Sequence, residues 1–174
     1  LSDAIAVKGV KIYVDGNEYT GTDLVAIKKG SDAKVGDSGN GVLTEVFYDD
    51  VDNTVIITMV NTYIGSIAKT VKATAKKDAY VVVDTDSTIA DFNDEYETEA
   101  FAEDDVVAFT YADGEIQTMY KMESVSGELT KKVIDKSLTL GDTTYKYGKE
   151  KTFNGTSEAG LTNKSSYDVY VDAN

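Results

Sequence analysis

Short runs of alternating apolar and polar residues, separated by Asp, Asn and Gly, make up most of the chain. Valine, isoleucine, threonine and tyrosine dominate these runs, and all four favour β-strands. Asp-Gly pairs at 15–16 and 113–114 each lie between two such runs. Because Asp-Gly supplies the positive φ angles of a tight hairpin turn, the pattern predicts an antiparallel hairpin at both places.

Two further hairpins follow from the same pattern. Gly141 and Asp142 join two strand-like runs, so a tight turn is expected between them. Residues 42–48 are expected to pair with residues 54–60 across the acidic turn 49–53.

Two segments fit more than one structure. The apolar positions of residues 61–72 have helical spacing, yet Thr62 and Tyr63 favour strands. We expect a long strand that bends near Gly65. Residues 87–100 could hold one helical turn or a short helix.

The chain as a whole is expected to be all-β. Turn signals recur about every ten residues, and no long amphipathic helical pattern is present. Small barrels and sandwiches are the usual ways to close short antiparallel strands. The sequence therefore predicts two or more small antiparallel barrel or sandwich modules packed in tandem.

Two phrases occur twice, which suggests duplicated modules. IYVDGN at 12–17 resembles VYVDAN at 169–174, and GVLTEV at 41–46 resembles GELTKKV at 127–133. Since the chain begins with Leu1 and its start lacks a leader pattern, we expect a mature or excised fragment. The predicted modules are residues 1–58, which would end one repeat and start the next, residues 59–124 in the middle, and a last module, complete or incomplete, over residues 125–174.

Composition argues against several functions. The 174 residues include no Cys, His, Trp, Pro or Arg, and the net charge is −14. Histidine is the side chain best suited to proton transfer near neutral pH, and Lys and Arg drive nucleic-acid binding. No apolar run approaches the length that a membrane span requires. We therefore expect no enzyme, no nucleic-acid partner, no membrane insertion and no required cofactor.

Acidic segments are the candidates for a metal site. Residues 84–105 contain ten Asp and Glu residues and no Lys, and the turn 49–53 contains three Asp residues. Clustered carboxylates could bind Ca²⁺, although solvated loops and turns have the same composition. No EF-hand pattern is present. The sequence assigns no catalytic or cofactor-binding residue, and it leaves any metal ligands unknown.

Tyrosine and lysine give two further hypotheses. The twelve Tyr residues could form a glycan-binding face, or they could half-bury their rings in the strands. Lysine could form an isopeptide bond with Asp or Asn on a neighbouring strand. A hydrolase that uses paired acids is a third alternative, but the chain lacks the Trp residues common in carbohydrate sites.

Six phrases in the second and last thirds of the chain are distinctive: VNTYI at 60–64, DDVV at 104–107, ADGEIQ at 112–117, ESVSG at 123–127, LGDTTYKY at 140–147 and YDVYVDAN at 167–174. Together they resemble the repetitive region of large surface proteins from Gram-positive clostridia of the gut. Those proteins usually carry S-layer homology domains, which hold the wall polymer; none is visible here.

The resemblance implies a structural module on the outside of a bacterial cell. Such an extracellular S-layer-like segment would self-assemble, or pack with neighbouring copies of the same surface protein, in a lattice or filament. The resemblance carries over no catalytic residues. The alternative is an extracellular adhesin module that binds glycans.

Overall fold

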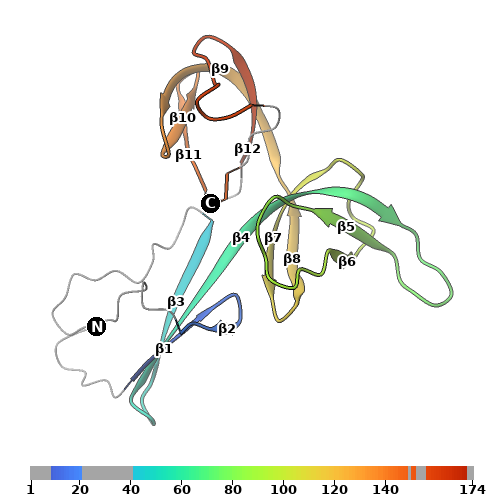
Figure 1. The fold of residues 1–174 in the computed structure, drawn as a ribbon, viewed down its shortest axis with the longest axis vertical. Coiled ribbons are helices and arrows are strands. Elements are labelled where there is room, and N and C mark those ends of the chain that lie inside the picture. The colour runs from blue at the N-terminus through green and yellow to red at the C-terminus, as the bar shows by residue number, and fades with distance from the viewer. Residues whose placement is uncertain (1–8, 21–40, 149, 152–155, 172–174) are drawn as a thin grey trace.

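The computed structural model describes residues 9–20, 41–148, 150–151 and 156–171, and these contain twelve strands and no helix (Figure 1). The all-β prediction is therefore confirmed. Residues 87–100 contain a short strand in place of the helical turn considered above. No described segment forms a helix that could cross a membrane.

The strands form two sheets, an eight-stranded first sheet and a four-stranded second sheet. The first sheet contains β1 (Gly9–Val14), β2 (Asn17–Glu18), β3 (Val42–Asp49), β4 (Thr54–Val71), β5 (Tyr80–Asp84), β6 (Glu95–Glu97), β7 (Val106–Ala112) and β8 (Glu115–Lys121). The second sheet contains β9 (Glu123–Val133), β10 (Ser137–Leu140), β11 (Thr143–Lys146) and β12 (Ser166–Val171).

All four predicted hairpins are present. β1 pairs with β2, β3 with β4, β7 with β8 and β10 with β11, each antiparallel. Both residues of the two Asp-Gly turns have positive φ, 49° and 80° at 15–16 and 53° and 82° at 113–114. These angles are those of the tight turn that the Asp-Gly pairs predicted.

The 18-residue strand β4 is the spine of the first sheet, which confirms the long strand predicted for residues 61–72. Its first half pairs with β1 and β3, and its second half with β5 and β7. Buried and half-buried residues alternate along most of its length. The irregularity in its pairing lies between Ile67 and Lys69, two residues beyond the predicted bend at Gly65.

One pairing departs from an all-antiparallel pattern. β1 runs parallel to β4, with Gly9 opposite Thr54 and Val14 opposite Met59. A parallel pair needs a long connection, and here β2, residues 21–40 and β3 lie between the two strands in sequence. Because β3 already forms a hairpin with β4 on one edge, β1 occupies the other edge.

Each sheet has its own group of buried apolar side chains. The group in the first sheet comes mainly from β4, β5, β7 and β8 and is centred on Phe109, which is fully buried. Tyr63 and Phe92 stack on Phe109. The second sheet buries four leucines, Leu129, Leu138, Leu140 and Leu161.

The two repeated phrases differ in how far their structures agree. The GVLTEV and GELTKKV phrases both enter antiparallel hairpins, β3–β4 and β9–β10, whose turns contain a non-glycine residue at positive φ, Asn53 and Asp135. The other phrase pairs differently, because β1 is parallel to β4 whereas β12 is antiparallel to β9. Residues 172–174 of its second copy lie outside the described residues.

The predicted module boundaries fall at distinct places in this fold. The boundary at 58/59 lies inside β4, whose pairing partners change three residues later, between Asn61 and Thr62. The boundary at 124/125 lies near the start of β9, where the second sheet begins. The division into three modules remains a prediction.

Candidate functional site

The long acidic segment 84–105 does not gather its carboxylates in one place. Asp105 pairs with Lys121 at 2.5 Å and Glu95 pairs with Lys77 at 2.6 Å. The backbone N–H of Ala102 and then Lys121 hold the pKa of Asp105 below its usual value. Among the described residues, no three acidic side chains form a group that could hold a metal ion. Calcium binding therefore remains a prediction without a site.

The acidic turn 49–53 uses its side chains for local structure. The Asp49 carboxylate accepts hydrogen bonds from the backbone N–H groups of Val51 and Asp52, at 3.0 and 3.2 Å. The Tyr48 hydroxyl donates to Asn53 at 2.7 Å. These contacts are typical of a turn closed by Asp and Asn side chains.

The twelve tyrosines behave mostly as strand residues with half-buried rings. Tyr63 and Tyr111 are buried, and Tyr48 and Tyr170 are the exposed pair. Tyr48 lies in the first sheet and Tyr170 in the second. The tyrosines therefore provide no cluster on one face that would favour the glycan-binding alternative.

One lysine lies between two carboxylates, as an isopeptide bond would require. Lys151 pairs with Asp135 and, at 3.1 Å, with Glu158. The Asp135 side chain is 75% exposed, and the two carboxylates raise the pKa of Lys151 above its usual value. Because amide formation requires a neutral amine, this arrangement favours an ion pair over a covalent bond.

A buried polar cluster lies at the point along β4 where its neighbouring strands change from β1 and β3 to β7. Asp15, in the turn after β1, accepts hydrogen bonds from the backbone N–H and the side-chain amide of Asn61, at 2.8 and 2.7 Å. It also accepts one from the Tyr63 hydroxyl at 2.8 Å. Asn61 is only 3% exposed, so these bonds replace its contacts with water. We call Asp15, Asn61 and Tyr63 the Asp15 junction.

The Asp15 junction brings two hairpin turns together. The Asp15 N–H donates to the Met59 carbonyl at 2.9 Å, which seats the β1–β2 turn against β4. A Cβ placed on the next residue, Gly16, would lie 3.0 Å from a carboxylate oxygen of Asp113, in the β7–β8 turn, and 3.2 Å from the Cβ of Ala112, at the end of β7. The two Asp-Gly turns thus meet on the same edge of β4, and the junction fixes both halves of the first sheet.

Part of this cluster could have been recognised from the sequence. Val55, Ile57, Asn61 and Tyr63 alternate along one face of the predicted strand, and Asn61 interrupts an otherwise apolar face. A polar residue at a buried position needs a partner. The sequence does not identify that partner, because Asp15 is 46 residues away and the Asp-Gly pattern assigns it to a hairpin turn.

The Asp15 junction gives a pH dependence. Burial, followed by the Asp15 hydrogen bond, raises the pKa of Tyr63 well above its usual value near 10. The unfolded chain then loses this proton first, so stability is full below about pH 10 and falls as the pH rises further. We expect Tyr63→Phe to cost about 1 kcal/mol at neutral pH and to weaken the alkaline loss.

Urea unfolding between pH 7.5 and 11, followed by circular dichroism, measures this effect. Replacing the exposed Tyr170 by Phe is the control and should leave the pH dependence unchanged. An equal alkaline loss in wild type and Tyr63→Phe would contradict the prediction.

A second junction connects the two sheets. Only Met122 separates β8 from β9; its side chain is 6% exposed and its N–H donates to the Val106 carbonyl at 2.9 Å. The Ser87 hydroxyl donates to the Glu150 carboxylate at 3.2 Å across the same region. A one-residue connection that is buried and hydrogen-bonded restricts rotation of one sheet relative to the other.

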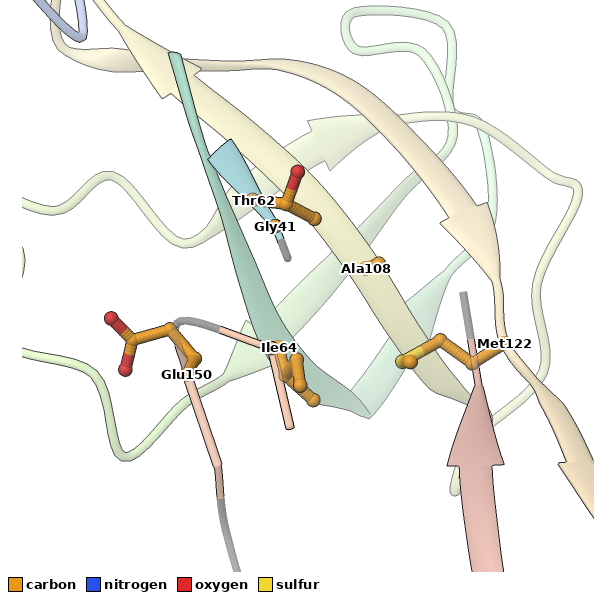
Figure 2. A pocket seen from close by; sticks show the side chains of 7 residues that line it. Gly41, Thr62, Ile64, Ala108, Met122 and Glu150 are labelled. Carbon is orange, nitrogen blue, oxygen red and sulfur yellow. The ribbon is translucent and has the colours of Figure 1, made fainter. Parts of the chain in front are cut away.

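A small hollow lies at this second junction. The residues that line it include Gly41, Ile64, Met122 and Glu150. In the view of Figure 2 the Ile64 side chain lies between the side chains of Glu150 and Met122. Its volume is about 20 Å³, which is room for about one water molecule. Ligand pockets are usually above about 300 Å³, so this hollow is too small for an organic substrate.

Comparison with known proteins identifies no relative. The chain matches no protein-family model, no curated protein and no solved structure.

Proposed function

We propose that the chain is a structural module of a bacterial cell-surface protein, which packs with its neighbours in an S-layer-like lattice or filament. The observation that carries the proposal is the pair of junctions described above. A passive building block must hold its parts in fixed positions, and buried polar contacts together with a one-residue connection do so.

Two further features support the proposal. The net charge of −14 keeps copies soluble until they meet at a specific surface. Exposed apolar side chains on β3, among them Val46 and Phe47, offer such a surface. The phrases quoted above suggest the same role by resemblance.

Two measurements test the proposal. An antibody against the chain should label intact cells of the organism that produces it, without lysis. Negative-stain electron microscopy of the purified chain at high concentration should show ordered arrays or filaments. Labelling that appears only after lysis, with dispersed single particles at every concentration, would contradict the proposal.

A further inference from the structure

Strands β1 and β3 and the first half of β4 form a three-stranded arm of the first sheet, which Figure 1 shows extending away from β5 to β8. Successive side chains of a strand point to opposite faces of a sheet. Val55 and Ile57 of β4 therefore share one face of the arm, and both are fully buried. Ile56, Thr58 and Val60 lie on the other face and are only half-buried. We call this second side of the arm the open face.

Residues of the two flanking strands widen the open face, because side chains directly opposite each other in paired strands share a face. Those opposite the three β4 residues are Leu43, Glu45 and Phe47 in β3, and Tyr13 and Lys11 in β1. Leu43 is 53% exposed and Phe47 is 50% exposed, which is high for large apolar side chains. A contiguous apolar patch with polar residues around it is typical of a surface that binds another protein.

Two opposite charges lie on the two sides of this patch. Lys11 belongs to β1 and Glu45 to β3, with β4 between them, and both side chains are exposed. Two strand spacings separate them, which is about 10 Å, so they do not pair within one copy. Neither has an ion-pair partner among the residues that the structure describes. Both charges can therefore pair with a second molecule.

We propose that the open face packs against the open face of a second copy of this chain, with two-fold symmetry. The inference rests on the proposed function, because that function makes copies neighbours. A two-fold contact uses the same patch on both copies, so the patch must be complementary to itself. An apolar centre with Lys11 on one side and Glu45 on the other meets this requirement. It does so on a chain whose net charge of −14 otherwise makes copies repel one another.

The two charges also select the orientation of the copies. Sheets that pack face to face lie about 10 Å apart with their strands roughly aligned. If the two-fold axis runs parallel to β4, then β3 of each copy lies over β1 of the other, and Glu45 lies near Lys11 of the second copy at two equivalent places. An axis that runs across the strands would instead place β3 over β3, with the two Glu45 carboxylates on the same side. The first orientation joins opposite charges, so it is the one that we expect.

The size of the open face determines how strong the contact is. Three short strands provide an interface at the low end of the range for specific complexes. We therefore expect a dissociation constant on the order of 0.1 mM for two copies in solution. In a lattice, several weak contacts act together and hold each copy more tightly than one contact does.

Charge reversal tests the orientation. In sedimentation equilibrium, Lys11→Glu and Glu45→Lys should each weaken self-association about fivefold or more, because each variant places like charges together at both places. The double variant restores opposite charges and should associate within about twofold of the wild type. Its net charge equals that of the wild type, so the recovery does not come from a change in overall repulsion. A double variant as weak as the single variants would overturn the proposed orientation.

A charge placed in the apolar centre tests the interface itself. Phe47→Glu should weaken self-association at least about tenfold, because two carboxylates would be buried in the contact. Val46→Glu is the matched control, since Val46 is the next residue of β3, is 55% exposed and points to the opposite face of the arm. Circular dichroism checks that both variants fold. An equal loss of association in Val46→Glu and Phe47→Glu would overturn the inference.

These results separate the interface from the proposed function. A wild-type chain that stays monomeric at about 1 mM overturns the inference. Arrays that form equally well with Phe47→Glu would also overturn it, while leaving the structural function in place. If the charge-reversal pair behaves as expected but antibodies fail to label intact cells, the interface stands and the surface location is wrong.

Discussion

Replacing Asp15 by alanine should destabilise the first sheet by about 3 kcal/mol more than the equivalent change at Asp113. The Asp15 carboxylate accepts three hydrogen bonds, two of them from the buried Asn61. Alanine would remove the acceptor of all three bonds, and each buried donor that is then left unpaired costs about 1–3 kcal/mol. Local adjustment and water entry reduce the total below the sum.

Asp113 is a matched control because it occupies the same position in the other Asp-Gly turn. The φ angles of the two residues are 49° and 53°, so alanine meets the same backbone strain at both sites. The Asp113 side chain is exposed and lies in a turn of the same type. The difference between the two variants therefore isolates the carboxylate contacts.

Hydrogen exchange locates the effect. With Asp15→Ala, amides of β1 and of the β4 segment from 54 to 63 should exchange faster, because the β1–β2 hairpin loses its attachment. Amides of the second sheet, which has its own buried leucines, should keep their rates. Equal stability of the Asp15→Ala and Asp113→Ala variants would contradict the role of the Asp15 junction.

Much of the local structure follows from the sequence. Hairpin turns depend on one or two residues with positive φ, and Asp-Gly pairs specify them at 15–16 and 113–114. The register of β3 on β4 follows from two alternating runs that flank a short turn. These features join residues fewer than 20 apart in the sequence.

The arrangement of the sheets does not follow from the sequence in the same way. The parallel pairing of β1 with β4 joins segments about 45 residues apart, and no local pattern distinguishes it from antiparallel pairing. The partner of Asn61 depends on that same pairing, since Asp15 reaches Asn61 only when β1 lies beside β4. A single long-range choice therefore determines both features.

The structure requires a glycine at position 65 for a different physical reason from the bend that the sequence predicted there. The sequence marks it as a possible bend in a long strand. Its φ is not positive, and its pairing with Val107 is regular. Glycine is needed there because a Cβ would lie 2.6 Å from the Asp84 carbonyl oxygen and 2.8 Å from a Val83 methyl group. This crowding depends on where β5 lies, which the sequence around Gly65 does not specify.

Replacing Gly65 by alanine should therefore be among the most damaging small changes in the chain, with a loss of about 3 kcal/mol. The carbonyl oxygen that blocks the new methyl group belongs to the backbone at the end of β5. It cannot move away without disturbing the pairing of Ser66 with Asp84. The strand conformation itself favours Ala over Gly by about 0.5–1 kcal/mol, so the measured loss understates the clash.

Two other strand glycines complete a graded series measured by urea unfolding. A Cβ at Gly9 would have no atom within 4 Å, so Gly9→Ala should be neutral or slightly stabilising. A Cβ at Gly127 would lie 3.0 Å from the Cβ of Leu140, and we expect an intermediate loss of about 1 kcal/mol, confined to the second sheet. Unfolding of Gly65→Ala and Gly9→Ala at the same urea concentration would contradict this prediction. It would mean that the backbone at the end of β5 does not lie as close to Gly65 as the structure places it.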